Sequence, residues 1–179
     1  MKCTAIAHRF TVLSRHQRGA SLLEGIAYLG IAAIVILGAI SLLTGAFSSA
    51  QSNRLGEEVV TIRTGVKKLY MGQASSYAPG VMNATLSSAK VFPATVNTTA
   101  PAAPTNAWGG TVTVTGITST FSIAYTAVPQ EVCIGALSGA SGWESVKGSG
   151  PIQTVFPLSP ANATATCTAG ANVVTWVAR

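Results

Sequence analysis

The sequence has no aspartate, and its two histidines, His8 and His16, both lie within the first 19 residues. Acid–base catalysis and zinc binding usually depend on His, Asp or Glu side chains that share a site. If the first 19 residues are removed, no histidine remains, and residues 73–179 contain Glu131 and Glu144 as their only acids. We therefore expect no enzyme, no metal site and no cofactor.

The chain has few charged residues, and the positive ones are unevenly distributed. The formal net charge is +6, yet the first 19 residues hold four of the 11 basic side chains and no acidic one. A nucleic-acid-binding protein usually carries a basic patch on its folded domain. Because the excess lies mainly in a short N-terminal segment, we expect no specific nucleic-acid partner.

A long apolar segment follows, because residues 25–47 contain no charged side chain. As a helix it would be about 35 Å long, which exceeds a hydrocarbon core of about 30 Å. The basic residues before it predict a cytoplasmic N-terminus and an exported C-terminal part. A secretory signal cleaved after Ala50 is the alternative, but such signals use only about 7 to 15 apolar residues.

The helix should continue beyond the apolar segment. Apolar residues recur at steps of three and four, which is the period of one helical face. They are Leu55, Val59, Ile62, Val66 and Leu69. Charged residues occupy the other faces, and Arg54 is spaced to reach Glu57 and Glu58. We predict one helix over about residues 21–70, apolar all round at first and then amphipathic.

A single carboxylate, Glu24, stands at the start of the apolar segment. Charged residues inside a membrane cost about 2.5 to 3.5 kcal/mol on insertion scales, so they usually mark function. The simpler alternative is that Glu24 lies among the lipid headgroups and reaches water.

Two segments of the C-terminal part alternate apolar and polar residues. Thr111–Thr115 and Phe121–Tyr125 flank a turn signal that contains Gly116, which predicts a β-hairpin. Val173–Val177 reads as a final strand. Gln73–Thr105 has one charge and several prolines, so we expect an exposed connecting loop.

Two short helices are also expected in this part. Pro129 is well placed as a first helical residue, and Gly139 should end that helix. A second short helix near Met82–Lys90 would interrupt the connecting loop.

Cys133 and Cys167 form an even pair if Cys3 is lost with the N-terminal segment. In an oxidising compartment the pair would most simply form a disulfide, which for a loop of this length contributes roughly 4 kcal/mol in the chain-entropy model. Two buried free thiols are the alternative. The wide spacing and the absence of histidine after His16 argue against zinc.

The stretch "QRGASLLEG" at residues 17–25 resembles the class III signal of type IV prepilins. The resemblance implies that a prepilin peptidase cuts between Gly19 and Ala20. In this family the new N-terminus can also be methylated, which the sequence does not decide for Ala20. It also implies that Glu24 pairs with the Ala20 amine of a neighbouring subunit as the helices bundle. The 19-residue leader and the non-aromatic Ala20 resemble the type IVb subclass.

The C-terminal part extends this resemblance. "TNAWGGTVTV" and "FSIAYTAVPQEVC" resemble the heads of plasmid-type thin-pilus and related type IVb pilins. The implied fold is α+β, with a long N-terminal helix packed on an antiparallel sheet and a C-terminal disulfide. In that family such a disulfide, here Cys133–Cys167, bounds a surface-variable segment, which would be Ser138–Thr166.

The resemblance implies three segments: a leader at 1–19 that is removed, a long helix at 20–72 and a head at 73–179. The chain would be a pilus subunit, expected to be the major one, in a filament for adhesion, aggregation or conjugation. Its partners would be itself, the prepilin peptidase, the inner-membrane assembly machinery and a recipient or host cell surface. Before assembly it would lie in the inner membrane with its head in the periplasm. A minor pilin, a type II secretion pseudopilin and a secreted or tethered binding domain are the alternatives.

Overall fold

The computed structural model describes residues 21–73 and 77–179, so Gly19 and Ala20 lie outside the described residues. The helices are α1 (Leu22–Leu69), α2 (Asn83–Ser88), α3 (Gln130–Leu137) and α4 (Pro160–Thr166). The strands are β1 (Tyr77–Val81), β2 (Val112–Thr118), β3 (Thr120–Pro129), β4 (Ser145–Lys147), β5 (Ile152–Gln153) and β6 (Ala171–Ala178).

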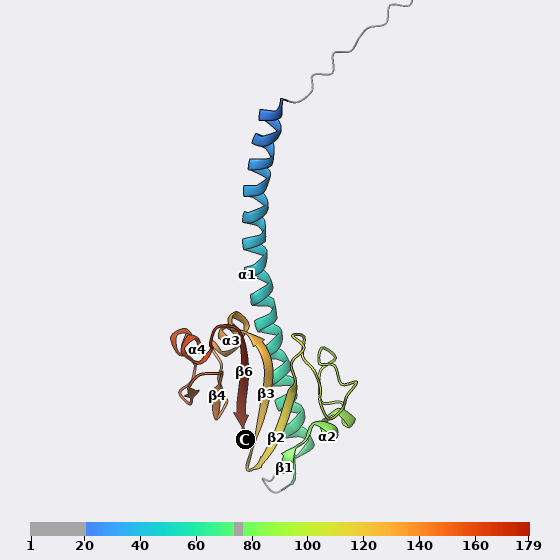
Figure 1. Ribbon diagram of the computed structural model, residues 1–179. Helices are drawn as coiled ribbons and strands as arrows, with labels where there is room; N and C mark the ends of the chain where they lie inside the picture. Colours follow the sequence, from blue (N-terminus) through green and yellow to red (C-terminus); the bar gives the residue numbers. More distant parts are fainter. Residues whose placement is uncertain (1–20, 74–76) are drawn as a thin grey trace, which may run out of the picture. The chain divides into compact units, whose positions relative to one another are not determined.

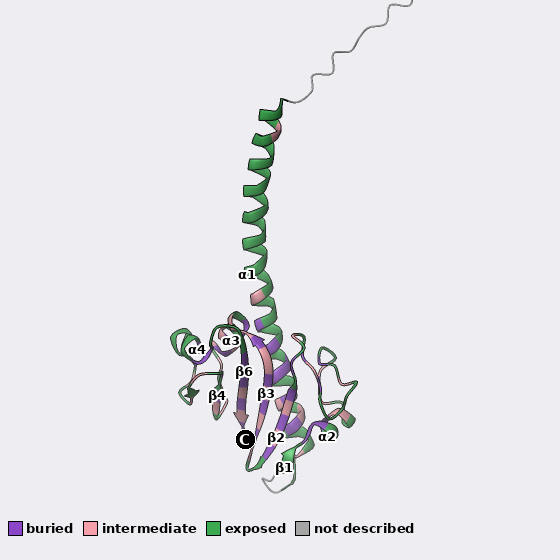
Figure 2. Cartoon of the chain, in the orientation of Figure 1, coloured by how far each residue is buried: buried purple, intermediate pink, exposed green. Residues whose placement is uncertain are grey.

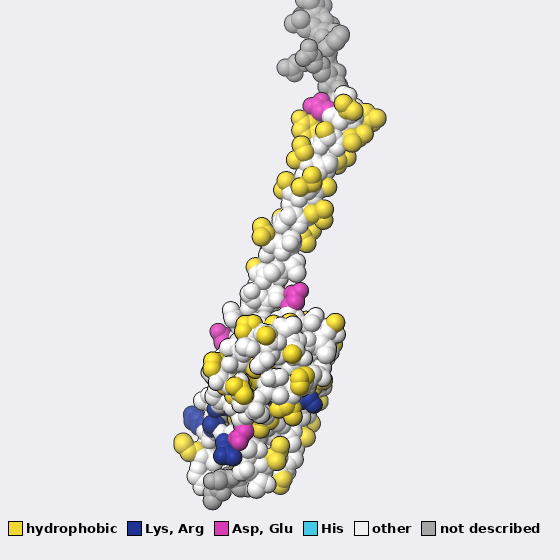
Figure 3. Space-filling view, turned by 90° about the vertical axis from the view of Figure 1, so that its left-hand side faces the viewer, with side chains coloured by type: hydrophobic (Ala, Val, Ile, Leu, Met, Phe, Trp, Pro, Cys, Tyr) yellow, Lys and Arg dark blue, Asp and Glu magenta, His cyan; other side chains and the backbone are white. Residues whose placement is uncertain are grey.

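Helix α1 confirms the predicted long helix to within one residue at each end. The structure divides within it, between Leu42 and Leu43, into two compact units. In the first unit the described side chains are almost all exposed, and hydrophobic side chains gather along the helix (Figures 2 and 3). In the second unit one stripe of the helix is buried against the sheet. The two patterns in the sequence therefore correspond to two different environments.

Among the described residues, six strands form one antiparallel sheet in the order β1-β2-β3-β6-β4-β5 (Figure 1). The alternation seen in the sequence decides which side chains point inward. Val112 and Val114 on β2, and Phe121, Ile123 and Tyr125 on β3, are fully buried. They pack with the buried stripe of α1, which consists of Leu55, Val59, Ile62 and Val66. The predicted helix-on-sheet architecture is confirmed.

The β-hairpin is confirmed, but the role predicted for Gly116 is wrong. Gly116 lies inside β2 and pairs with Phe121, while the chain reverses between Thr118 and Thr120. A Cβ at Gly116 would lie 2.1 Å from the carbonyl oxygen of Ala78. This glycine is therefore required because β1 approaches closely, a contact that local sequence patterns do not reveal.

The expectation of an exposed loop over Gln73–Thr105 is wrong in two respects. The segment contains strand β1 as well as the anticipated short helix α2. It also supplies core residues, because Met82, Leu86, Phe92 and Val96 are buried. These residues are spaced irregularly, so no helix or strand period marked them in the sequence.

Asn83 anchors this segment to the hairpin. Its side-chain Nδ2 donates to the Val112 carbonyl at 2.9 Å, and its Oδ1 accepts from the Val114 backbone N–H at 2.8 Å. Both bonds are buried, where such polar contacts are strongest. The Asn83 side chain thus forms the hydrogen bonds to β2 that a neighbouring strand would otherwise form.

The C-terminal half matches the prediction in α3 and β6 and adds three short elements. Pro129 caps α3 instead of occupying its first turn, and Gly139 follows with a φ of 77°. Strands β4 and β5 and helix α4 all lie in the segment expected to be surface-variable. The two edge strands offer little for further pairing. Strand β1 contains Pro79, which has no backbone N–H, and β5 has only two residues.

Candidate assembly site and its support

Glu24 lies in the first turn of α1, where its Oε1 accepts a hydrogen bond of 3.3 Å from the Tyr28 hydroxyl. Leu22 and Leu23 beside it are 86% and 79% exposed. A carboxylate next to bare apolar side chains is poorly placed in lipid unless a positive partner joins it.

The first part of α1 is long and apolar enough to cross a membrane. Its most apolar window has a mean hydropathy of 2.6, and none of that window is buried. Burial of apolar surface is favourable by about 25 cal/mol per Å². This helix therefore requires lipid or other apolar helices around it.

The interface between α1 and the sheet contains a buried carboxylate, Glu58. It was expected on a solvent-facing side of the helix, and that expectation is wrong. Its Oε1 accepts from Arg54 Nε at 3.1 Å, which confirms one of the two predicted Arg54 contacts. Its Oε2 accepts from the Tyr125 hydroxyl of β3 at 3.3 Å. Burial and the Glu58 carboxylate raise the pKa of Tyr125, so this phenol stays protonated.

Helix α3 packs closely against α1 at Gly135. A Cβ at Gly135 would lie 2.3 Å from the Ser52 hydroxyl oxygen. Ser52 itself is buried and donates to the Ser48 carbonyl at 2.9 Å. The pair of small residues lets the helices approach, and it fixes α3 beside the helix that leaves the head.

The turn before β2 is organised by Asn106. Its Oδ1 accepts from the backbone N–H groups of Trp108 and Gly110, at 3.0 and 2.9 Å. Its Nδ2 donates to the Thr126 carbonyl on β3 at 2.8 Å. Trp108 then reaches α1, where its Nε1 donates to Gln51 Oε1 at 3.0 Å. The recognisable "NAWGG" stretch therefore connects the hairpin to α1.

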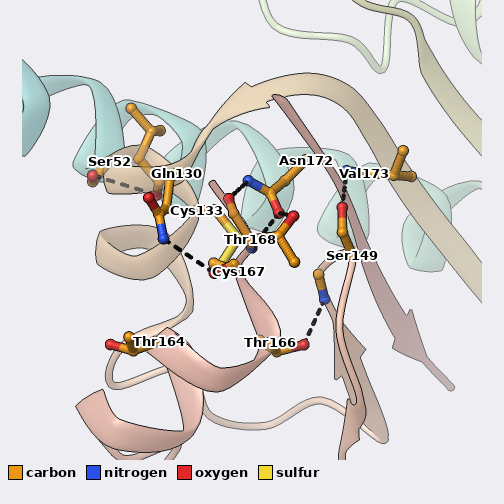
Figure 4. The surroundings of a disulfide bond; sticks show 12 residues. Ser52, Gln130, Cys133, Ser149, Thr164, Thr166, Cys167, Thr168, Asn172 and Val173 are labelled. Atoms are coloured by element: carbon orange, nitrogen blue, oxygen red, sulfur yellow. Dashed lines mark hydrogen bonds between the residues drawn. A yellow bond between two sulfur atoms is a disulfide. The ribbon is translucent and has the colours of Figure 1, made fainter. Parts of the chain in front are cut away.

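The disulfide predicted from the two C-terminal cysteines is present. Cys133 on α3 and Cys167 after α4 are bonded, with Cα atoms 6.0 Å apart, and both are buried (Figure 4). Gln130 donates to the Cys167 carbonyl at 3.4 Å, and the Thr166 hydroxyl accepts from the Gly148 N–H at 3.0 Å. The bond thus holds the segment that carries β4, β5 and α4 against α3.

Trp143 and Trp176 have packing roles. Their ring centroids are 6.5 Å apart, and the Arg63 guanidinium carbon lies 4.6 Å from the Trp143 centroid. Arg63 also donates to the Gly142 carbonyl. These contacts fasten the loop after α3 to α1.

Residues 49–179 match the family model described as PilS N terminal. A crystal structure of a type IV b pilin from Salmonella typhi is similar, with 25% identity and a TM-score of 0.54. The similarity covers 68% of this chain and 97% of that one. The chain belongs to the PilS family and is a type IVb pilin. A search of curated proteins gave no match.

A pilin is a structural subunit and not an enzyme, in agreement with the sparse set of acids and with histidines at positions 8 and 16 alone. The apolar part of α1 fits a membrane-anchored precursor that becomes part of a surface pilus. The structure joins Cys133 and Cys167 in one disulfide, and Glu24 belongs to the separate unit formed by the first part of α1. The sequence indicated Glu58 as a partner of Arg54, Tyr125 as the end of an alternating segment and Asn106 as the start of the recognised turn motif. It did not indicate the Glu58–Tyr125 hydrogen bond or the bonds that Asn106 makes in the turn.

Proposed function

We propose that this pilin is the major subunit of a type IVb pilus and is cut between Gly19 and Ala20 before assembly. Under this proposal its segments are the leader 1–19, the helix 20–72 and the head 73–179. The observation that carries the proposal is the bare apolar surface of α1, which bears Glu24 at its start. A chain that worked as a monomer would have no use for such a surface outside lipid.

Cleavage would place a new amine on Ala20, four residues before Glu24. In a bundle of such helices the amine of one subunit pairs with the Glu24 carboxylate of its neighbour. Opposite charges attract strongly at low effective dielectric, whereas either charge alone is costly to bury. Neutralisation of this pair would set the register of each incoming subunit.

The subunit would wait in the inner membrane with its head in the periplasm, as the basic leader predicts. The prepilin peptidase would act on the cytoplasmic side, and the assembly machinery would then draw the helix from lipid into the filament. Each subunit would use one surface toward the subunit before it and another toward the subunit after it. Such a heterologous contact extends instead of closing.

The test is the intact mass and the N-terminal sequence of the mature protein, from cells with and without their prepilin peptidase. We expect a peptidase-dependent start at Ala20 and abundant pilin in material sheared from the cells. A mature chain that begins at Gln51 would remove Glu24 and the apolar helix, and would overturn the proposal in favour of a secreted domain.

The abundance of the protein separates the major pilin from its nearest alternative. A minor pilin or a type II secretion pseudopilin would also start at Ala20 but would be scarce in sheared filaments. If the protein is abundant there, wild-type cells can be compared with cells that lack it. Adhesion, aggregation and mating assays will then show for which of these processes the pilus is used.

A further inference from the structure

The exposed side of α1 within the head carries opposite charges at its two ends. Glu57, Thr61, Thr64 and Lys68 are all exposed and follow one another at steps of four, three and four residues. Residues with this spacing form a line along a helix. The 11 steps from Glu57 to Lys68 correspond to about 16 Å along the axis and to about three full turns. We call these four residues the charge stripe.

Neither end of the charge stripe is used within the subunit. In residues 21–73 and 77–179, the ion pairs are Arg54–Glu58 and Glu144–Arg179. The carboxylate of Glu57 and the ammonium of Lys68 have no hydrogen-bond or ion-pair partner in this part of the chain. Between them lie only hydroxyl side chains, so no charge separates the two ends.

The surface is hollowed beside each end. A hollow of about 550 Å³ adjoins Glu57 and is lined by small residues that include Gly56 and Gly135. A second hollow, of about 500 Å³, adjoins Lys68 and is lined also by Gly65 and Lys90. The first can admit a long side chain next to an acid, and the second adds another positive charge near Lys68.

We propose that the charge stripe is a contact between successive subunits, in which Glu57 of one copy receives Lys68 of a second copy. This inference rests on the proposed function, because it needs parallel helices in a filament. A parallel neighbour displaced by about 16 Å along the axis brings the two charges level. Every subunit then gives Glu57 to one neighbour and Lys68 to another, and the contact repeats along the fibre.

Exchange of the two charges tests the pairing in cells that express the full chain. We expect Glu57→Lys and Lys68→Glu each to lower the pilin in the sheared fraction about tenfold or more, because like charges meet at the interface. The double variant E57K/K68E restores the pair and should return the yield to near the wild-type value. If the double variant assembles no better than the single ones, the pairing is wrong.

The matched control is E57K/K147E, which has the same net charge but places the new acid on the exposed Lys147 of β4, away from the stripe. It should stay as defective as Glu57→Lys alone, and its recovery would count against the pairing. Immunoblots of whole cells establish that each variant accumulates to the same level as the wild type.

Cysteine crosslinking gives a second readout. Within one chain, residues 57 and 68 are about 16 Å apart along the helix, and a disulfide requires Cα atoms within about 7 Å. The variant E57C/K68C can therefore link these positions only between subunits. Oxidised filaments should give a ladder of multimers on non-reducing gels, whereas monomers alone from assembled filaments would overturn the proposal. Absence of wild-type filaments would instead overturn the proposed function.

Discussion

The Tyr125 hydroxyl donates a hydrogen bond of 3.3 Å to Glu58 Oε2, across the interface between strand β3 and helix α1. Arg54 binds the other carboxylate oxygen from the exposed side. The buried acid is thus satisfied by one partner from its own helix and one from the sheet. Because Tyr125 and Glu58 both lie in the second unit, this contact helps to fix the C-terminal part of α1 on the sheet.

Removal of the tyrosine hydroxyl should loosen this interface. Tyr125→Phe leaves a buried carboxylate with one donor fewer, which should cost about 1.5 to 3 kcal/mol in unfolding free energy. Urea unfolding of the purified full chain in detergent, followed by tryptophan fluorescence, measures the loss. Tyr70→Phe is the control, since the Tyr70 hydroxyl has no hydrogen-bond partner in the described part of the chain. Equal stability of both variants would show that the Tyr125–Glu58 hydrogen bond does not stabilise the fold.

The same pair predicts a dependence of stability on pH. The pKa of Tyr125 is raised from 10.0, chiefly by burial and then by Glu58. Above pH 10 the unfolded chain loses this proton and the folded chain keeps it, so unfolding becomes easier as the pH rises. The slope is at most about 1.4 kcal/mol per pH unit. The difference between wild type and Tyr125→Phe should shrink above pH 10, and a constant difference would contradict this reading.

Loss of the disulfide should destabilise the subunit. Cys133→Ser removes the link between α3 and the segment before β6, worth roughly 4 kcal/mol in the chain-entropy model. We expect low subunit levels and rapid proteolysis of the head in cell extracts. Cys3→Ser, in the proposed leader, is the matched control and should behave as wild type. Normal protease resistance of Cys133→Ser would show that the bond is dispensable.

Two adjacent glycines in the turn before β2 should respond differently to the same substitution. A Cβ at Gly110 would lie 2.0 Å from the Thr126 carbonyl oxygen, so Gly110→Ala should cost about 3 kcal/mol or more. Gly109 has a φ of 75° and open space around it, so Gly109→Ala should cost only about 1 to 2 kcal/mol. The midpoints of urea unfolding rank the stabilities of the two variants. A lower midpoint for Gly109→Ala than for Gly110→Ala would be inconsistent with this turn geometry.

Neutralisation of Glu24 should separate membrane insertion from assembly. Glu24→Ala or Glu24→Val keeps the apolar helix, so the precursor should still enter the membrane and be processed. Filament growth should fall sharply, because in the proposed pairing the Ala20 amine of the neighbour loses its partner. Glu131→Ala, at an exposed acid on α3, is the control. Sheared filaments at wild-type level from the Glu24 variants would refute the pairing.

The parts of the fold that the sequence predicts are those with a repeated pattern. The steps of three and four from Leu55 to Val66 marked the buried side of α1, and the alternation around Val112 and Ile123 marked the hairpin. The disulfide followed from cysteine number and compartment. The burial of Glu58 could not be predicted, because it depends on a contact with Tyr125, which is 67 positions away in the sequence.

The shorter elements carry too little pattern to be recognised. Strand β4 has three residues, and its place is decided by pairing with Val177 and its neighbours on β6. Strand β1 contains Pro79 and Gly80, which ordinarily argue against a strand. Such segments are fixed by hydrogen bonds to strands already in place, and their own residues do not specify them.

The two edge strands of the sheet, β1 and β5, also bear on how pilin subunits meet one another. Pro79 on β1 has no N–H to offer a neighbouring strand, and β5 is too short to template one. The heads can therefore crowd together without merging their sheets into amyloid-like stacks. Under the proposed function, polymerisation is thereby left to the helices, and it would begin where the assembly machinery extracts them.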